Sequence, residues 1–155
     1  KYLGETSGRI ADLFCGVGTF SYPLARNPAN RVLAVDSSER LLEGFRRTVN
    51  KNMIPNIEIA AKNLFKYPLD ATELKGFNAV VFDPPRAGAA AQSARLAALP
   101  ADERPEKIIA VSCNPGTFVN DANTLVSAGY KLVEVTMADQ FVYSDHSELV
   151  ALFTK

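Results

Sequence analysis

The sequence predicts a doubly wound α/β domain built on a mostly parallel, seven-stranded sheet with an antiparallel last strand. Short apolar runs alternate with segments of helical periodicity along the whole chain. This alternation is typical of parallel strands joined by helical crossovers. Only about nine residues separate the last two apolar runs, too few for a helical crossover. The last strand is therefore expected to run antiparallel to its neighbour.

Seven apolar runs supply the expected strands. They lie at 9–14, 31–36, 56–61, 77–83, 107–113, 130–138 and 148–154. The clearest helix is 37–52, because apolar side chains recur on one face at helical spacing and a serine can cap its start. The side chains expected on that face are Leu41, Leu42, Phe45 and Val49.

Three further helices are expected. Pro23 should kink or delay a first helix at 19–26, since proline lacks the amide hydrogen that the helix interior needs. An alanine-rich segment, 89–99, favours a second. A third should begin at Pro115, with Asn114 as its cap, and end at Gly129.

Composition limits the possible functions. The 155 residues suit one domain, 1–155, and 17 basic residues balance 17 acidic ones. A neutral chain lacks the usual excess of positive charge of a nucleic-acid-binding domain, so any RNA would be bound mainly by other segments.

The chain starts at Lys1 rather than Met, which suggests a fragment of a longer protein. No apolar run reaches the roughly 20 residues of a membrane helix. Two cysteines with one histidine favour neither a metal site nor a disulfide. A cytoplasmic location is therefore expected.

Polar residues gather at the carboxyl ends of the expected strands, where ligands bind in a doubly wound sheet. An antiparallel last strand would begin at that same edge. The residues expected there are Asp12 to Gly18, Asp36, Asn63, Asp83 to Arg86, Cys113, Asn114 and Glu148. A hydrophobic core alone does not require polar residues at every strand end.

The glycine turn after the first strand suggests a nucleotide site. Gly16 and Gly18 allow close approach of a ligand, and Asp36 follows at the distance expected of a carboxylate that holds ribose hydroxyls. A tight turn with a helix-capping aspartate would look similar. Ser21 stands where the dinucleotide fingerprint has glycine, and Asp12 could reach an ammonium group, so S-adenosyl-L-methionine is favoured over NAD.

The segment "DPPR" gives Asp83 a fixed direction, because two prolines stiffen the loop. The alternative is a rigid turn with an aspartate cap. Enzymes that methylate exocyclic amines place an aromatic residue after the second proline to stack on the target base. Arg86 occupies that position here and argues for different chemistry.

Cys113 is the candidate nucleophile. Free cysteines are commonly buried core residues, and Cys15, in the glycine turn, is interpreted in that way. Cys113 instead sits at a strand end just before a helix start, where the helix dipole stabilises a thiolate. Glu148 is expected at the same rim and would form an acid–base pair with it, although it could also be an exposed strand-start residue. His146 is interpreted as a hydrogen-bonding support rather than a metal ligand.

The motifs "DLFCGVGTF", "VD", "DPPRAG", "SCNPGT" and "DHSELVALF", in this order, resemble those of the RNA 5-methyluridine methyltransferase family. The resemblance spans nearly the whole chain and implies a Rossmann-like class I S-adenosylmethionine-dependent methyltransferase fold, matching the family's C-terminal catalytic domain. The family is typically longer, with an RNA-binding β-barrel and in some members an iron–sulfur cluster. Two departures are a missing proline after Phe141 and Ser147 in place of an aliphatic residue.

The resemblance also implies a mechanism for methylating carbon 5 of uracil in tRNA or rRNA. Cys113 would attack carbon 6, carbon 5 would take the methyl group, and Glu148 would remove the carbon 5 proton. Asp83 would bind the pyrimidine edge or assist the thiol, and Arg86 would orient the base or a phosphate. The residues that the resemblance assigns to the cofactor are Asp12, Phe14, Gly16, Gly18, Asp36, Asn63 and Asp83.

Two other functions stay open at this point. An exocyclic-amine methyltransferase would need no cysteine nucleophile. A domain that binds the cofactor or docks RNA without catalysis would need neither Cys113 nor Glu148 for chemistry.

Overall fold

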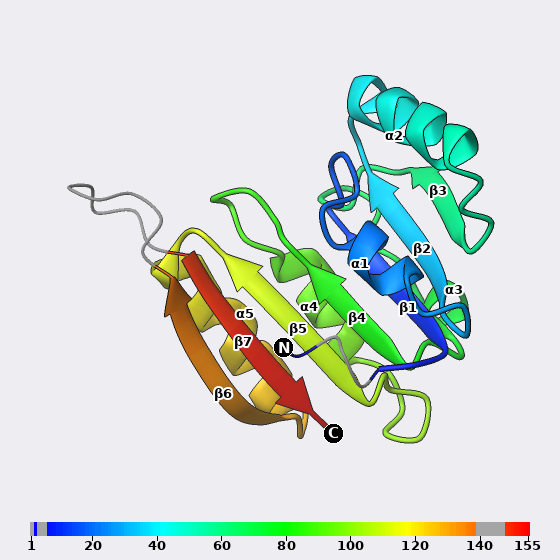
Figure 1. Ribbon diagram of the computed structural model, residues 1–155. Coiled ribbons are helices and arrows are strands. Elements are labelled where there is room, and N and C mark those ends of the chain that lie inside the picture. The colour runs from blue at the N-terminus through cyan, green and yellow to red at the C-terminus, as the bar shows by residue number, and fades with distance from the viewer. Residues whose placement is uncertain (1, 3–5, 139–147) are drawn as a thin grey trace.

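A computed structural model describes residues 2, 6–138 and 148–155. A seven-stranded sheet runs through it in the order β3-β2-β1-β4-β5-β7-β6 (Figure 1). The strands are β1 (Arg9–Leu13), β2 (Arg31–Asp36), β3 (Ile57–Ala61), β4 (Ala79–Phe82), β5 (Lys107–Ser112), β6 (Lys131–Ala138) and β7 (Glu148–Thr154). The first five are parallel, and β7 runs antiparallel between β5 and β6. The predicted fold class is confirmed.

Helices cover both faces of the sheet. They are α1 (Ser21–Ala25), α2 (Glu39–Lys51), α3 (Ala71–Leu74), α4 (Ala90–Ala97) and α5 (Pro115–Ser127). Figure 1 shows α1 and α2 on one side of the sheet and α4 and α5 on the other. Each side has its own hydrophobic core, one built with α1 and α2 and the other with α3, α4 and α5. No helix in the described part of the chain is long and apolar enough to cross a membrane.

The helix expected at 37–52 forms, with two differences in detail. Leu42, Phe45 and Val49 are buried, but Leu41 is 41% exposed, so its assignment to the buried face was wrong. Leu41 lies at the border of the apolar stripe, where a large side chain can point to water. Ser38 stands at the cap position, yet its hydroxyl makes no capping bond. Its backbone amide instead donates to the Asp36 carboxylate.

The helices around prolines behave as expected. α1 starts at Ser21, two residues later than the earliest expected start, so that Pro23 lies in the first turn where no amide hydrogen is needed. α5 starts at Pro115, and the Asn114 side chain accepts from the Gly116 amide.

α3 was not predicted. It is only four residues long, too short to show helical periodicity, but it carries a recognisable cap. The Asp70 carboxylate accepts from the Thr72 and Glu73 amides, and Glu73 accepts in return from the Asp70 amide. This reciprocal capping box was a readable signal in "DATE".

Arg104 joins the ends of two helices. Its guanidinium donates to the Leu99 carbonyl at 2.8 Å and to the Ala97 carbonyl at 3.1 Å, and it also bonds the Ala128 carbonyl. These carbonyls lie at the carboxyl ends of α4 and α5, where backbone acceptors lack partners within the helix. One side chain therefore satisfies several acceptors and holds the two helices together.

Replacing Arg104 with glutamine should lower the free energy of unfolding by about 2 kcal/mol, because a charged donor to buried helix ends is lost. Urea unfolding monitored by circular dichroism measures the change. Arg95→Gln, on the exposed side of α4, is the matched control and should stay within about 0.5 kcal/mol of the parent. Equal stabilities of the two variants would contradict the structural role of Arg104.

Candidate active site

Three aspartates at strand ends point to the same side of the sheet. Asp12 is in β1, Asp36 ends β2 and Asp83 follows β4. The residues two positions before each of them belong to the core on the α1–α2 side. Because side chains alternate along a strand, all three carboxylates are directed to that side.

Cys113 and Glu148 lie at the same end of the β5–β7 ladder. The last pair of this antiparallel ladder is Ser112 with Leu149. Cys113 directly follows Ser112 in the chain, and Glu148 directly precedes Leu149. Val150 and Leu152 pack on the α1–α2 side, so by the same alternation Glu148 is directed to that side, like the three aspartates. The thiol of Cys113 is free and half-buried. Direct pairing of these two side chains stays a prediction.

Asp12 is fully buried and only partly satisfied. Its Oδ2 accepts from the Ser21 hydroxyl, while its Oδ1 has no hydrogen-bond partner among the described residues. Burial raises the pKa of Asp12 from 3.8 to about 7, opposed by Ser21 and reinforced by the charges of Asp83 and Asp36. A buried carboxylate oxygen that lacks a hydrogen-bond partner and lies near other negative charges is suited to binding a cationic ligand group. Sequence reasoning missed Ser21, which showed only as a departure from the dinucleotide pattern.

The Asp36 carboxylate ties the glycine turn to α2. Its Oδ2 accepts from the Gly16 amide at 2.9 Å, and its Oδ1 accepts from the Ser38 amide at 2.8 Å. Each carboxylate oxygen can accept a further hydrogen bond. The residue is thus held rigidly and keeps acceptor capacity for a pair of ligand hydroxyls.

The two glycines of the turn have different surroundings. A Cβ at Gly16 would meet nothing within 4 Å, so the backbone there borders open space. Gly18 has φ +91, and a Cβ there would lie 2.4 Å from the Phe45 ring. Gly18 is therefore required by packing against α2, whereas Gly16 leaves room for a ligand.

A cleft of about 380 Å³ opens beside these groups. The residues that line it are Phe14, Asp36, Ser37, Phe65, Asp83, Pro84 and Pro85. The rings of Phe14 and Phe65 are 5.3 Å apart, and Phe14 has the unusual φ of 60°. A strained non-glycine residue at a cleft is typical of functional sites. Phe65 and Ser37 gave no sequence signal, because neither belongs to a periodic pattern.

Asn63 supports this cleft rather than lining it. Its side-chain oxygen accepts from the backbone amides of Phe65 and Lys66 at 3.1 and 3.2 Å. It thereby fixes the turn that carries Phe65. Direct contact of Asn63 with a cofactor stays a prediction.

Asp83 lines the cleft and is influenced by the charge of Glu148. Burial raises the pKa of Asp83 from 3.8 to about 6, and the negative charge of Glu148 adds to the rise. The backbone amide of Asp83 also donates to the Leu13 carbonyl at 3.2 Å, which ties this strand end to β1. The two carboxylates are therefore close enough to influence each other electrostatically.

Three other residues singled out from the sequence are Arg86, Cys15 and His146. The Arg86 side chain is exposed beyond the two prolines. Cys15 is 5% exposed, in keeping with the structural interpretation, and burial strongly raises the pKa of its thiol. His146 lies outside the described residues. Within 2, 6–138 and 148–155, no three His, Cys, Asp or Glu side chains are arranged to hold a metal.

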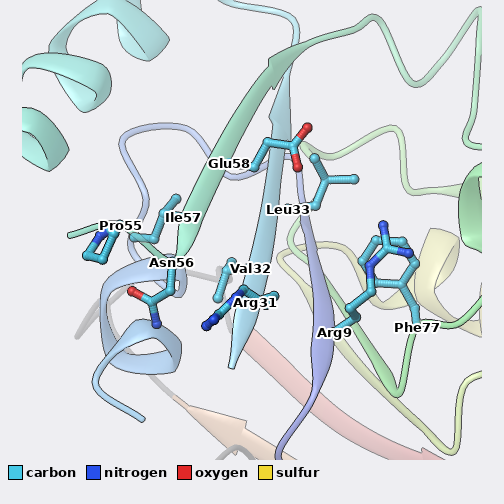
Figure 2. A pocket seen from close by; sticks show the side chains of 9 residues that line it. All are labelled: Arg9, Arg31, Val32, Leu33, Pro55, Asn56, Ile57, Glu58 and Phe77. Carbon is cyan, nitrogen blue, oxygen red and sulfur yellow. The ribbon is translucent and has the colours of Figure 1, made fainter. Parts of the chain in front are cut away.

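A second hollow lies at the opposite edge of the sheet, at the amino ends of β1, β2 and β3 (Figure 2). There the Arg9 guanidinium stacks 4.4 Å from the centre of the Phe77 ring and donates to the Lys75 carbonyl. Arg31 donates to two backbone carbonyls nearby. None of the predicted site residues lines this hollow, which separates it from the candidate active site.

Comparisons with known proteins assign the chain to one family. The family described as tRNA (uracil-5-)-methyltransferase matches residues 1–155. An uncharacterized RNA methyltransferase of Caulobacter vibrioides is 43% identical, over 97% of this chain and 35% of the relative. The 23S rRNA (uracil(1939)-C(5))-methyltransferase RlmD of Acinetobacter baylyi is 37% identical, over 94% of this chain and 31% of the relative.

A solved structure is similar as well. The tRNA (uracil-54, C5)-methyltransferase of Pyrococcus abyssi, in complex with S-adenosyl-L-homocysteine, superimposes with a TM-score of 0.80. It is 35% identical, and the match covers 96% of this chain and 35% of that protein. The chain thus spans about a third of the length of the relatives it matches.

The fold is that of a class I S-adenosylmethionine-dependent methyltransferase domain. Within that class, the chain belongs to the tRNA (uracil-5-)-methyltransferase family. The resemblance stated from the five sequence motifs is confirmed.

The raised pKa of Asp12 predicts a pH dependence of stability. Between pH 3.8 and about 7, the folded state keeps a proton on Asp12 that the unfolded chain has lost, so stability should fall as the pH rises through this range. Asp12→Asn removes the effect. Relative to the parent, the variant should gain about 2 to 3 kcal/mol of unfolding free energy between pH 5 and pH 7.

Urea unfolding at pH 5, 6, 7 and 8 tests this expectation. Asp102→Asn, at an exposed loop position, is the control and should follow the parent at every pH. A parallel pH dependence for Asp12→Asn and the parent would show that Asp12 is not the buried acid responsible.

Proposed function

We propose that this domain catalyses S-adenosylmethionine-dependent methylation of carbon 5 of a uracil in tRNA or rRNA. The observation that carries the proposal is the β5–β7 register: Ser112 pairs with Leu149, and the residues just beyond this pair are Cys113 and Glu148. The charge of Glu148 also acts on Asp83. An amine methyltransferase or a docking module would need no thiol and carboxylate facing each other at the ligand edge. Family membership and relatives with this activity support the same reaction.

The residues at the cleft fit S-adenosylmethionine. The unpartnered, buried Asp12 oxygen suits the cofactor's ammonium group, and the Asp36 carboxylate suits ribose hydroxyls. The open space at Gly16 would let the cofactor approach the backbone of the glycine turn closely. The rings of Phe14 and Phe65 would offer an aromatic surface for the adenine of the cofactor. The cofactor would supply the electrophilic methyl group that carbon 5 of uracil accepts. Gly18 and Asn63 would shape this site through the turns that they support.

The protein's residues would then carry out the remaining steps. The Cys113 thiolate forms a bond to carbon 6 of the uracil, and the electron pair of the 5,6 double bond makes carbon 5 nucleophilic. After carbon 5 is methylated, Glu148 takes the proton from carbon 5. The electron pair of that C–H bond restores the double bond, the C6–S bond breaks, and Cys113 leaves as a thiolate.

Asp83 and Arg86 would position the uracil. A carboxyl group whose pKa is raised to about 6 can carry a proton near neutral pH and donate a hydrogen bond to a carbonyl of the base. Arg86 sits just beyond the two prolines, where its guanidinium can orient the base or a phosphate. The target base must be unpaired or flipped out to reach the thiol.

Most of the RNA grip would come from outside this domain. The chain is neutral, whereas tight phosphate binding needs an excess of lysine and arginine. The relatives are about three times as long, which leaves room for RNA-binding segments in a full-length protein. We place the reaction in the cytoplasm, in line with the cysteine content of the chain.

Glu148→Gln in the full-length protein should lower kcat by about 100- to 10,000-fold, because the general base is lost after the covalent bond has formed. The methylated RNA should then stay attached to Cys113 and migrate with the protein on denaturing gels. Mass mapping of the cross-linked peptide identifies the thiol.

Two further variants sharpen this test. Cys113→Ala should abolish both the adduct and methylation, while Glu58→Gln, exposed on β3, should behave as the parent. Full methylation of RNA by Cys113→Ala would exclude the covalent mechanism. It would favour the alternative function, an exocyclic-amine methyltransferase.

Asp36→Asn should weaken S-adenosylmethionine binding by about 10- to 100-fold, since a charged acceptor contributes about 1.5 to 3 kcal/mol to a hydrogen-bonded ligand. Isothermal titration calorimetry measures the Kd, with Asp102→Asn as the charge-matched control. If the parent protein binds no S-adenosylmethionine at all, the methyltransferase proposal fails.

A further inference from the structure

We propose that Asn114 and Thr117 are positioning residues, which clamp the "DPPRAG" loop to the start of α5 and so fix Asp83 and Arg86 relative to Cys113. The inference rests on the proposed function, because it assigns these residues to the uracil-C5 reaction. It concerns contacts between two motifs that lie about 30 residues apart in sequence.

The Asn114 side chain makes two different hydrogen bonds. Its oxygen accepts from the Gly116 amide at 3.0 Å, which caps α5. Its amide nitrogen donates to the Arg86 carbonyl, also at 3.0 Å. Serine or aspartate would cap the helix equally well. A carboxylate has no hydrogen to donate to the Arg86 carbonyl, and the single hydroxyl oxygen of serine stands closer to the backbone than the amide nitrogen that reaches this carbonyl. The second bond thus gives asparagine a role beyond capping.

Thr117 supports the same carbonyl. Its hydroxyl lies 3.3 Å from the Arg86 carbonyl and 3.2 Å from the Asn114 carbonyl, and its single hydrogen can be donated to either. The Arg86 carbonyl can accept two bonds, so both side chains can hold it at once. Asn114 and Thr117 are one turn apart and face the loop together.

The loop lies tightly against this face of α5. Gly88 has φ +77, and a Cβ there would come within 2.8 Å of the Thr117 side chain. One turn further along the helix, the buried Asp121 carboxylate accepts from the Ala89 amide at 2.8 Å. Three side chains on one helix face therefore fasten the loop at successive points.

This clamp joins the two chemical groups through short, stiff connections. Asn114 directly follows Cys113 in the chain. On the other side, only Pro84 and Pro85 separate Asp83 from Arg86, and their fixed φ angles leave little play. Holding the Arg86 carbonyl therefore holds Asp83 and the Arg86 side chain with respect to the thiol.

The test uses Asn114→Ser and Thr117→Val in the full-length protein. Serine keeps the helix cap and valine keeps the shape of threonine, so folding should be little affected. We expect kcat for uracil methylation to fall by about 10- to 100-fold in Asn114→Ser and by a smaller factor in Thr117→Val, because small displacements of catalytic groups have effects of this size. The KM for RNA and the Kd for S-adenosylmethionine should change by less than about threefold.

Matched controls lie on the same helix. Thr124→Val removes a hydroxyl that donates to the Asn120 carbonyl of its own helix. Asn123→Ser changes an exposed residue. Both should keep the parent's kcat. Hydrogen exchange provides a readout that does not depend on catalysis, and the amides of 86–89 should exchange faster in Asn114→Ser and Thr117→Val than in the controls.

The outcomes separate the two proposals. If the parent protein leaves uracil unmethylated, the proposed function fails, while faster exchange at 86–89 in the two variants would still support the clamp. If the parent is active and the two variants match their controls in kcat and in exchange, the positioning inference is overturned. If the fall in kcat is accompanied by a marked loss of thermal stability, the lower activity reflects unfolding of the variants. The residues then have a purely structural role, and this outcome also overturns the positioning inference.

Discussion

The antiparallel pairing of β5 with β7 is the constraint on which the candidate active site depends. A parallel strand would begin at the opposite edge of the sheet, so only the reversed direction of β7 brings its first residue, Glu148, to the edge where β5 ends. The register matters equally. A slip of one residue would turn Glu148 to the other face of the sheet, away from Cys113. β7 packs on both cores, with Ala151 and Phe153 on the α4–α5 side and Val150 and Leu152 on the α1–α2 side.

The site gathers several carboxylates at one edge and on one face, which is costly for a folded protein. Asp12 is buried with an unpaired oxygen, and its raised pKa reflects the loss of hydration as well as the neighbouring negative charges. A sulfonium cofactor with an ammonium group would offset this charge. RNA phosphates would not, since they are themselves negative. Under the proposed function, the edge is electrostatically suited to the cofactor, and basic residues elsewhere would draw in the RNA.

Sequence reasoning reached the strands and the rim because both depend on short-range patterns. A buried strand is a continuous apolar run between turns, and the polar residues that follow it must lie at the edge. What it missed depends on contacts between distant residues. The bond from Ser21 to Asp12 and the position of Phe65 beside Phe14 arise only when loops fold over the strand ends. The exposure of Leu41 depends likewise on where the helix meets the sheet.

The motifs "DPPRAG" and "SCNPGT" are distant in sequence but are joined by hydrogen bonds in the folded domain. From sequence, Asn114 is a helix cap, and any of several short polar residues would satisfy that need. The structure adds a neighbour, the Arg86 carbonyl, and Asn114 serves it and the helix together because its acceptor and its donor are two separate atoms at the end of the side chain. The requirement for asparagine therefore follows from the packing of the "DPPRAG" loop against α5. In this domain the residue after the candidate nucleophile links local helix formation to the placement of the groups that would hold the uracil.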